Sequence, residues 1–530
     1  MMRSRSGLLA TAIGSVMVVA CGGAGAPTAV PTPTSSLAGT APGQVARSAS
    51  PFQSGCGRNE AGTLYVNAEA EPHLAANPAR PLNLIAAWQQ DRWNNGASRG
   101  IGTAFSIDGG LTWSQSALPF SVCSGGTFER ASDPWLTIGP TGIAYQMALS
   151  VTGAVFGAGS VNAMLVSRSV DGGATWSAPQ TLIQDTAPFF NDKNAITADP
   201  TDARFVYAAW DRLRQNAGGP AYLARSVDGG ASFLQAQPVF DPGPNSQVIG
   251  AEVVVAADGT VLYFFTRIDA LPNNRSGSSL NVLRSTDHGG TWSEPIRIAD
   301  MLAIGARDPE TGAGVRDGSL LAHAAAGPRS VVAVFQDARF SGGARDGVAF
   351  VRSLDFGRTW TSPARINGEP SSTAFTAQAV ITADDGVAVS YFDFRSNTPD
   401  ASTLPTNYWL ASSRDGETWA EASISGPFNM QTAPNAGALF IGDYMGLAAA
   451  QNTVHSLHVR TVGDPNNLTD VFFATPARSV SANPAATTSR EYRSQFARDS
   501  DITPELRVLA SENIARRLGA KLTRRPLPLR

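Results

Sequence analysis

The stretch "SVDGGATW", residues 169–176, recurs along the chain and decides the fold class. Each copy lies between two short runs rich in apolar residues, a pattern that predicts β-strands joined by a turn. The other copies are "SIDGGLTW" (106–113), "SVDGGASF" (226–233), "STDHGGTW" (285–292), "SLDFGRTW" (353–360) and the shortened "SRDGETW" (413–419). A turn repeated this often predicts one architecture built from a repeated unit.

The aspartate of each copy is predicted to be structural and not catalytic. Its carboxylate can accept hydrogen bonds from its own turn, while glycine supplies a positive φ and tryptophan packs beside the turn. No copy combines a nucleophile with a base. The six aspartates are Asp108, Asp171, Asp228, Asp287, Asp355 and Asp415.

The spacing of these aspartates predicts an all-β β-propeller. Successive copies are 57–68 residues apart, which is enough for four short strands. We expect blades of four strands over residues 62–480, and we favour seven blades over six. Six blades carry the repeated turn, and a seventh, with strands at 439–451, 453–462 and 469–479, lacks it. We expect residues 62–67 to supply the missing strand of that blade and close the ring.

The pattern S-x-D-x-G-x-T-W resembles the Asp-box, or BNR, repeat of sialidases and related secreted propellers. The resemblance covers roughly residues 62–480 and implies a sialidase-type propeller, with the boxes on the face away from the active site. In that family three arginines hold the substrate carboxylate, and the first belongs to an F/Y-R-I-P motif. Here the first blade opens with "AEPHL" (70–74), so Glu71 and Pro72 stand where the arginine and the proline are expected.

The N-terminus is typical of an exported protein. Arg3 and Arg5 precede an apolar run at 7–20 that is too short to span a membrane, so residues 1–20 are predicted to be a signal peptide. "VVAC" (18–21) resembles the lipobox of bacterial lipoproteins, which implies lipidation of Cys21 and anchoring to the outer membrane or cell surface. The alternative is an ordinary signal peptide with a chance cysteine.

The segments on either side of the propeller differ from it in composition. Residues 21–61 are rich in Pro, Ala, Ser and Thr, which predicts a flexible linker. Cys56 and Cys123 are expected to form a disulfide in an oxidising compartment, with two buried thiols as the alternative. The tail, 481–530, contains a predicted amphipathic helix at 503–522 and ends in basic residues, which are either solvated or in contact with an anionic surface.

The charge balance limits the partners. The formal net charge is −3, which leaves no basic surplus for nucleic acid. We expect a monomer that meets the membrane only through its lipid anchor. The five histidines show no metal-binding spacing, so no cofactor or metal is predicted, while a structural Ca²⁺ held by loop oxygens stays open.

Charged residues are predicted to converge on the propeller axis, where first strands begin and second strands end. Acidic residues and arginines alternate there, so they either brace neighbouring blades as salt bridges or bind a ligand. The candidates for catalysis are Glu71, Asp133, Asp317, Asp443 and Tyr444. The candidates for substrate binding are Arg92, Arg212, Arg267, Arg339 and Arg395.

The leading functional hypothesis is a sialidase-like surface glycosidase that acts on extracellular glycans. The alternative is a non-catalytic propeller that binds glycan or protein. A glycosidase needs two carboxyl groups facing each other within about 5–10 Å and not both held by arginine. A sialidase also needs three free arginines that converge on one pocket.

Overall fold

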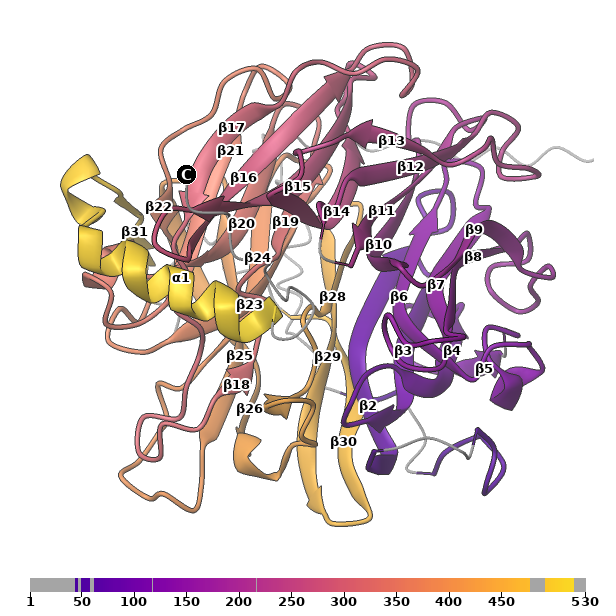
Figure 1. Ribbon diagram of the computed structural model, residues 1–530, viewed down its shortest axis with the longest axis horizontal. Coiled ribbons are helices and arrows are strands. Elements are labelled where there is room, and N and C mark those ends of the chain that lie inside the picture. Colours follow the sequence, from indigo (N-terminus) through magenta and orange to yellow (C-terminus); the bar gives the residue numbers. More distant parts are fainter. Residues whose placement is uncertain are drawn as a thin grey trace, which may run out of the picture. The chain divides into compact units, whose positions relative to one another are not determined.

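The computed structural model describes residues 43–45, 49–57, 62–116, 118–215, 217–476 and 491–518 (Figure 1). The predicted signal peptide, Cys21, most of the linker and the basic residues after Leu518 lie outside these ranges. The described residues form an all-β β-propeller with one C-terminal helix. No helix among them is both long enough and apolar enough to cross a bilayer.

The repeated unit is an antiparallel sheet whose strands follow one another in chain order. The unit of residues 189–240 contains β10 (Phe189–Ala198), β11 (Val206–Arg214), β12 (Ala221–Ser226) and β13 (Gln237–Phe240). Most of β10 and β11 is buried, whereas β13 is partly exposed. The first strand is therefore the innermost and the fourth the outermost, as expected for strands packed between neighbouring sheets.

Four other sheets have the size of a blade. Two have four strands: β14 (Ser246–Val255), β15 (Val261–Leu271), β16 (Arg275–Ser285) and β17 (Ile296–Met301) in one, and β28 (Gly446–Ala450), β29 (Thr453–Asp464), β30 (Asn467–Ala474) and β1 (Gly43–Gln44) in the other. Two have five strands: β19 (Ala322–Ala326), β20 (Val331–Asp337), β21 (Gly347–Ser353), β22 (Ala364–Arg365) and β32 (Gln495–Phe496), and then β23 (Ala374–Ile381), β24 (Val387–Asp393), β25 (Pro405–Ser413), β26 (Thr418–Asn429) and β31 (Glu491–Arg493).

The first strands of the propeller form one continuous sheet of eight strands. Its members are β2 (Leu64–Ala76), β3 (Leu84–Trp93), β4 (Ser98–Ser106), β5 (Ser114–Ser116), β6 (Arg130–Ile138), β7 (Ala144–Thr152), β8 (Val161–Ser169) and β9 (Gln180–Thr186). The pairing of Ser98 with Ala131 joins β4 to β6. Ser98 Oγ also donates a hydrogen bond to the Ala131 carbonyl at 2.8 Å.

The predicted count of seven separate four-stranded blades, with six as the alternative, is therefore wrong. The described strands form five separate blades of four or five strands, together with the eight-stranded sheet. Counting repeated turns gave the wrong number because a turn motif does not show whether one sheet is hydrogen-bonded to the next. The innermost strands nevertheless surround one axis: β2, β6, β10, β14, β19, β23 and β28 contact one another in that order, and β28 contacts β2.

The N-terminal segment closes this ring, but through a different strand from the one predicted. Residues 62–67 do not join the last sheet, because Leu64 already begins β2, which pairs with β3. Instead β1 pairs with β30, and the Gln44 amide donates a hydrogen bond to Asp470 at 2.6 Å. Farther along the predicted linker, Cys56 and Cys123 form a disulfide, with their Cα atoms 5.5 Å apart.

The repeated turn is held by its own side chains. In the copy at 169–176, Thr175 N and Thr175 Oγ1 both donate hydrogen bonds to the Asp171 carboxylate, and Ser169 Oγ donates a third at 2.8 Å. The indole N–H of Trp176 donates to the Gly173 carbonyl at 3.1 Å. The same bonds to the aspartate recur at Asp108, Asp228, Asp287 and Asp355.

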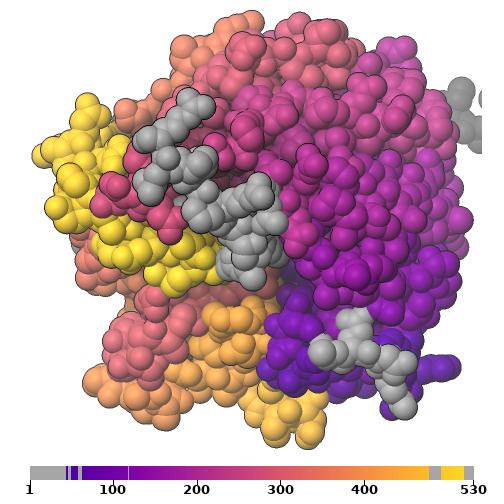
Figure 2. All heavy atoms as spheres, viewed as in Figure 1, coloured from indigo at the N-terminus to yellow at the C-terminus, as the bar shows by residue number. Residues whose placement is uncertain are grey.

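The C-terminal residues run along the outer edges of two blades before they form a helix. β31 pairs with β26, and β32 pairs with β22. Helix α1 (Pro504–Leu518) follows and contacts β16. Figure 2 shows these residues, in yellow, at the surface beside the magenta residues of the middle of the chain. The short 3-10 turns are η1 (Val122–Ser124), η2 (Arg339–Ser341), η3 (Met430–Thr432) and η4 (Asp499–Asp501).

Candidate functional site

A recurring β-bulge places charged side chains at one level of the central axis. β2, β6 and β10 each contain a bulge, and the bulged residue has a left-handed backbone: φ is 50° at Glu71, 51° at Asp133 and 47° at Lys193. This conformation costs a non-glycine residue about 1–3 kcal/mol, so neighbouring structure has to hold it in place. Because the bulge recurs in three adjacent innermost strands, the three side chains meet.

Lys193 lies at the centre of three carboxyl groups. Its Nζ is 2.8 Å from Asp443 Oδ2, 3.6 Å from Glu71 Oε1 and 3.7 Å from Asp133 Oδ2. Burial opposes the charge on Lys193, but Asp133, Asp443 and Glu71 outweigh it and raise the pKa of the ammonium above its usual value. Lys193 is therefore a permanent cation that holds the acidic side chains together.

Asp443 is bound by two arginines as well as by Lys193. Arg316, in β18 (Val315–Arg316), which pairs with β27 (Leu439–Phe440), places Nη2 2.7 Å from Oδ2 and Nε 3.1 Å from Oδ1. Arg517 of α1 places Nη2 3.0 Å from Oδ1. Burial alone would raise the pKa of Asp443, but Arg316, Lys193 and Arg517 hold it well below its usual value. Asp443 is thus a fixed anion.

Glu71 has the opposite electrostatic character. Burial, reinforced by Asp133 and Asp443 and opposed by Lys193, raises the pKa of Glu71 to about 8. The Gln89 amide donates a hydrogen bond to Oε2, and the Asp443 N–H donates to Oε1 at 3.4 Å. Near neutral pH this carboxyl group holds its proton, which is the property required of a general acid.

Asp133 is the least engaged of the three acids. Ser132 Oγ donates a hydrogen bond to Oδ1 at 2.8 Å, while Oδ2 accepts none from any described residue. Glu71 Oε1 and Asp133 Oδ2 both lie within 3.7 Å of Lys193 Nζ, so these two oxygens are at most about 7 Å apart. This upper limit admits both the carboxyl spacing of about 5–5.5 Å in retaining glycosidases and the lower part of the range of about 6.5–9.5 Å in inverting ones.

The remaining catalytic candidates are held by structural bonds. The Tyr444 hydroxyl donates to the Pro134 carbonyl at 3.1 Å, and burial raises the pKa of Tyr444 well above its usual value. The Asp317 carboxylate accepts hydrogen bonds from Ala306 N at 2.6 Å, Gln336 Nε2 at 3.0 Å and Ser319 N at 3.1 Å. Tyr444 is therefore a poor nucleophile, and Asp317 fixes the loop before β18.

Of the five arginines predicted to bind substrate, only Arg92 lies at the central cluster. Its Nη1 donates to Gln89 Oε1 at 2.8 Å, its guanidinium lies 4.9 Å from the centroid of the Phe440 ring, and burial lowers its pKa to about 10. The other four form salt bridges: Arg212 with Asp185, Arg267 with Asp269, Arg339 with Asp337, and Arg395 with Asp393 and Glu421. Arg212 and Arg395 thus reach another strand, β9 and β26, whereas Arg267 and Arg339 pair with an aspartate two residues away. None of the four lines either cavity described below.

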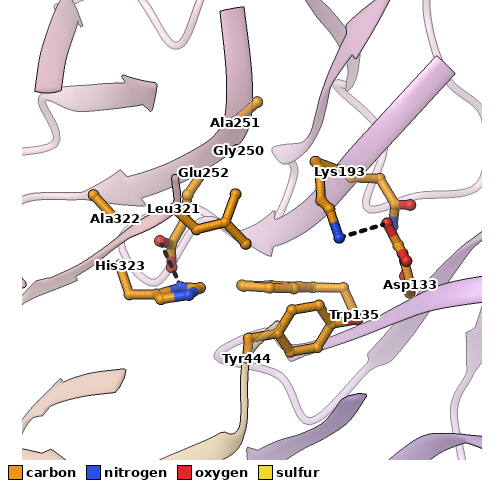
Figure 3. Close-up of a pocket in the computed structure, with 11 residues that line it drawn as sticks. Asp133, Trp135, Lys193, Gly250, Ala251, Glu252, Leu321, Ala322, His323 and Tyr444 are labelled. Atoms are coloured by element: carbon orange, nitrogen blue, oxygen red, sulfur yellow. Dashed lines mark hydrogen bonds and ion pairs between the residues drawn. The ribbon is translucent and has the colours of Figure 1, made fainter. Parts of the chain in front are cut away.

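Two cavities meet at Lys193. The larger has a volume of about 620 Å³ and is lined by Lys193, Arg316 and Asp443 together with the end of α1. The smaller, about 20 Å³, is lined by Asp133, Trp135, His323 and Tyr444 (Figure 3). A volume of about 20 Å³ accommodates roughly one water molecule, so the larger cavity is the one of ligand size.

The six aspartates of the repeated turns line neither cavity. Glu71 also lines neither and lies beside the cavities behind Lys193 and Asp133, and Asp133 lines only the smaller one. Among the described residues, no group of three or more His, Cys, Asp or Glu side chains is arranged to hold a metal ion.

The sequence did not single out three of the residues that define this site. Lys193 lies at the bulge in the middle of β10, and Arg316 ends the two-residue strand β18. Nothing in the neighbouring sequence distinguishes these two residues from other charged residues near predicted strands. Arg517 lies in the last turn of α1, 74 residues after Asp443 in the chain. Only the path of the C-terminal segment across the blades brings it to the axis.

Comparison with known proteins gives matches only among solved structures. No protein-family model matches the chain, and no curated protein matches it. A protein of unknown function from Dyadobacter fermentans is 16% identical, with a TM-score of 0.42 over 66% of this chain and 98% of that one. A Hadza microbial sialidase is 16% identical, with a TM-score of 0.41 over 75% of this chain and 74% of that one.

An α-L-arabinanase from Penicillium chrysogenum is 12% identical, with a TM-score of 0.44 over 82% of this chain and 98% of that one. Further matching structures include α-L-arabinofuranosidases of Fusarium graminearum and a sialidase of Trypanosoma rangeli.

Proposed function

We propose that the protein is a glycoside hydrolase whose reaction takes place beside Lys193. The observation that carries this proposal is the pairing of Glu71, whose pKa burial raises to about 8, with the Asp133 carboxyl group, whose Oδ2 lies at most about 7 Å from Glu71 Oε1. Cleavage of a glycosidic bond requires a proton donor for the departing oxygen and a second carboxylate, and Glu71 and Asp133 have these two characters.

Each residue has a defined part in this proposal. Glu71 donates its proton to the leaving oxygen. Asp133 acts through Oδ2, the oxygen that accepts no hydrogen bond from a described residue, as base or nucleophile. Lys193 keeps both acids in place, and Asp443 keeps Lys193 in place.

The charge of the cluster supports a glycan that carries an anionic group. The wall of the larger cavity contains five basic side chains, Lys193, Arg307, Arg316, Arg516 and Arg517, and three acidic ones, Asp192, Asp317 and Asp443. An uncompensated buried cation is costly, so an anion in the larger cavity would stabilise the site. Sialic acid is one member of this class, although Arg316 and Arg517 are paired with Asp443 and do not form a set of three free arginines.

We place this activity on extracellular glycans, outside a bacterial cell. The predicted signal peptide and the lipobox at Cys21 support an exported protein held at the membrane by lipid. This location would bring the cavity within reach of glycans on the same or a neighbouring cell.

A second candidate function is glycan binding without catalysis. It is favoured by the observation that Lys193 contacts all three central acids and that Glu71 is only 1% exposed. In that case the cluster is a rigid recognition element, and the high pKa of Glu71 only reflects burial.

The test compares Glu71→Gln with wild type on a panel of aryl glycosides that includes an aryl sialoside. If Glu71 is the proton donor, the substitution lowers kcat about 10²- to 10⁴-fold while substrate affinity is preserved. Glu69→Gln is the matched control, because Glu69 is also buried, has a raised pKa and lies in the same strand. Binding of an acidic glycan without turnover of any glycoside in the panel would establish the non-catalytic function instead.

A further inference from the structure

Helix α1 is firmly attached to the propeller. Leu506 and Ala510 pack with Leu302 and Ala338, and Ile514 and Leu518 pack with Ile268 and Leu320. The amide of Asn513 donates hydrogen bonds to the Ala303 carbonyl at 3.0 Å and to Ser319 Oγ at 3.1 Å. A helix fixed by both apolar and polar contacts belongs to the folded core, so its last turn has a defined position.

That last turn forms part of the wall of the larger cavity. Arg516, Arg517 and Leu518 all line it. Arg517 Nη2 donates hydrogen bonds to the Asp317 carbonyl and to Asp443, and Arg516 Nη2 donates to the Ile304 carbonyl at 2.8 Å. Both guanidinium groups are thus oriented by main-chain carbonyls. Arg516 forms no ion pair with a described residue, whereas Arg517 is also paired with the Asp443 carboxylate at 3.0 Å.

The wall of the cavity carries more positive than negative charge. Its cations are Lys193, Arg307, Arg316, Arg516 and Arg517, and its carboxylates are Asp192, Asp317 and Asp443. Burial and the neighbouring Arg307 lower the pKa of Arg516, so two like charges face each other there. The C-terminal end of a helix carries a partial negative charge of about half an electron, and two arginines in the last turn outweigh it.

We propose that α1 is part of the ligand site and that Arg516 and Arg517 bind the anionic groups of an acidic oligosaccharide. Arg517 and Arg316, which both contact Asp443, bind one anionic group. Arg516 and Arg307, which line another part of the same cavity, bind a second one. The ligand class is a glycan with a carboxylate or a sulfate on more than one sugar. This inference rests on the proposed glycan-binding role of the cavity and assigns its recognition to a segment outside the repeated sheets.

Guanidinium groups suit this role because their planar set of donors matches the oxygens of a carboxylate or a sulfate. The existing bonds leave donors available, since Arg517 donates through Nη2 alone to the described residues. An anion that reaches Arg517 also relieves the excess of cations around Asp443. Recognition of this kind is sensitive to ionic strength, because part of the cavity is open to solvent.

The experiment measures binding by titration calorimetry on the mature chain with three probes of equal length: an oligogalacturonate, a heparin-derived oligosaccharide and a neutral oligosaccharide. Wild type is compared with the double variant Arg516→Ala/Arg517→Ala and with the control Arg507→Ala. Arg507 lies on the same helix and pairs with Asp300 at 3.0 Å, but it does not line the cavity.

We expect wild type to bind at least one acidic probe and not the neutral one. The double variant should bind that probe about 10- to 100-fold more weakly, and Arg507→Ala should bind it as wild type does. Arg517→Lys should fall between them, because it keeps the charge and loses the planar donors. The two acidic probes show whether the site prefers carboxylate or sulfate.

Two results would overturn the inference: equal affinity of the double variant and wild type, or no binding of either acidic probe by wild type. A thermal unfolding curve of each variant shows whether the fold is intact, and Arg517→Lys keeps the test valid if the double variant unfolds. Catalysis is scored separately. Binding that depends on the two arginines, without any hydrolysis, supports this inference and refutes the hydrolase. Hydrolysis that the double variant leaves unchanged supports the hydrolase and refutes this inference.

Discussion

At the scale of single residues, the decisive group is Lys193, whose ammonium contacts three carboxyl groups that differ in protonation. Asp443 is ionised because two arginines and Lys193 surround it, while Glu71 is protonated because it is buried and lies near two other acids. The difference arises from geometry alone, since a Glu and an Asp have similar pKa values in water. The site thus contains a protonated and an ionised carboxyl group at the same pH.

The raised pKa of Glu71 gives a testable dependence of stability on pH. In the unfolded chain Glu71 ionises near pH 4.5, and in the folded protein it ionises near pH 8. Folding therefore takes up a proton between these values, so this contribution to stability is complete below about pH 4.5 and is lost as the pH rises to about 8. We expect the melting temperature to fall across that window in wild type and to fall less in Glu71→Gln. Parallel melting curves of the two proteins against pH would contradict the assignment.

At the scale of elements, the repeated turn fastens the third strand of a unit to the fourth. The Asp171 carboxylate accepts three side-chain and backbone hydrogen bonds from Ser169 and Thr175, all of them within the turn. The turn is exposed to solvent, so hydrogen bonds and not apolar packing stabilise it. The motif therefore needs a short acidic side chain and not a large apolar one.

Replacing this carboxylate should lower stability without affecting the ligand site. We expect Asp171→Ala to lower the free energy of unfolding by about 1–2 kcal/mol, because each lost hydrogen bond contributes about 1 kcal/mol or less at an exposed turn. Asp171→Asn is the matched control, since its amide oxygen still accepts from Thr175. Chemical denaturation measures the difference, and titration with the acidic probe should give the wild-type affinity. A loss of affinity in Asp171→Ala would show that the turns communicate with the cavity.

The elements also show what sequence patterns can and cannot predict. The strands follow from apolar patterns and from the repeated turns, and Glu71, Asp133 and Asp443 follow from their places near the predicted starts of first strands. The bulges do not follow, because Glu71, Asp133 and Lys193 have no residue in common that demands a positive φ. The sequence also does not predict the pairing of Ser98 with Ala131, because that pairing depends on two chain segments meeting in space.

At the scale of the whole molecule, the net charge of the chain does not indicate the local charge of the larger cavity. A net charge of −3 gives no sign of a cavity wall with five cations, because the surplus is local and is balanced elsewhere on the surface. Arg517 reaches the axis only because β31 and β32 guide the C-terminal segment along two outer edges. Such contacts between distant parts of a chain have no local signal in the sequence.

Closure of the ring by β1 can be tested with two truncations. Removal of residues 1–42 leaves β1 intact and should not change the melting temperature. Removal of residues 1–48 takes away β1 and the Gln44–Asp470 hydrogen bond, and it exposes the edge of β30. We expect the shorter protein to melt earlier and to associate at high concentration, because an unpaired strand edge recruits other strands. Calorimetry and size-exclusion chromatography report both effects, and identical behaviour of the two proteins would show that β1 is dispensable.

The pairing of β1 with β30 also determines when the protein can finish folding. Gln44 and Asp470, which this pairing brings together, are 426 residues apart in the chain. At about 5–20 residues per second, synthesis of the intervening chain takes roughly 20–90 s, so β1 waits that long for its partner. Until then β1 can pair with the β30 edge of another copy, which is a route to association by strand exchange.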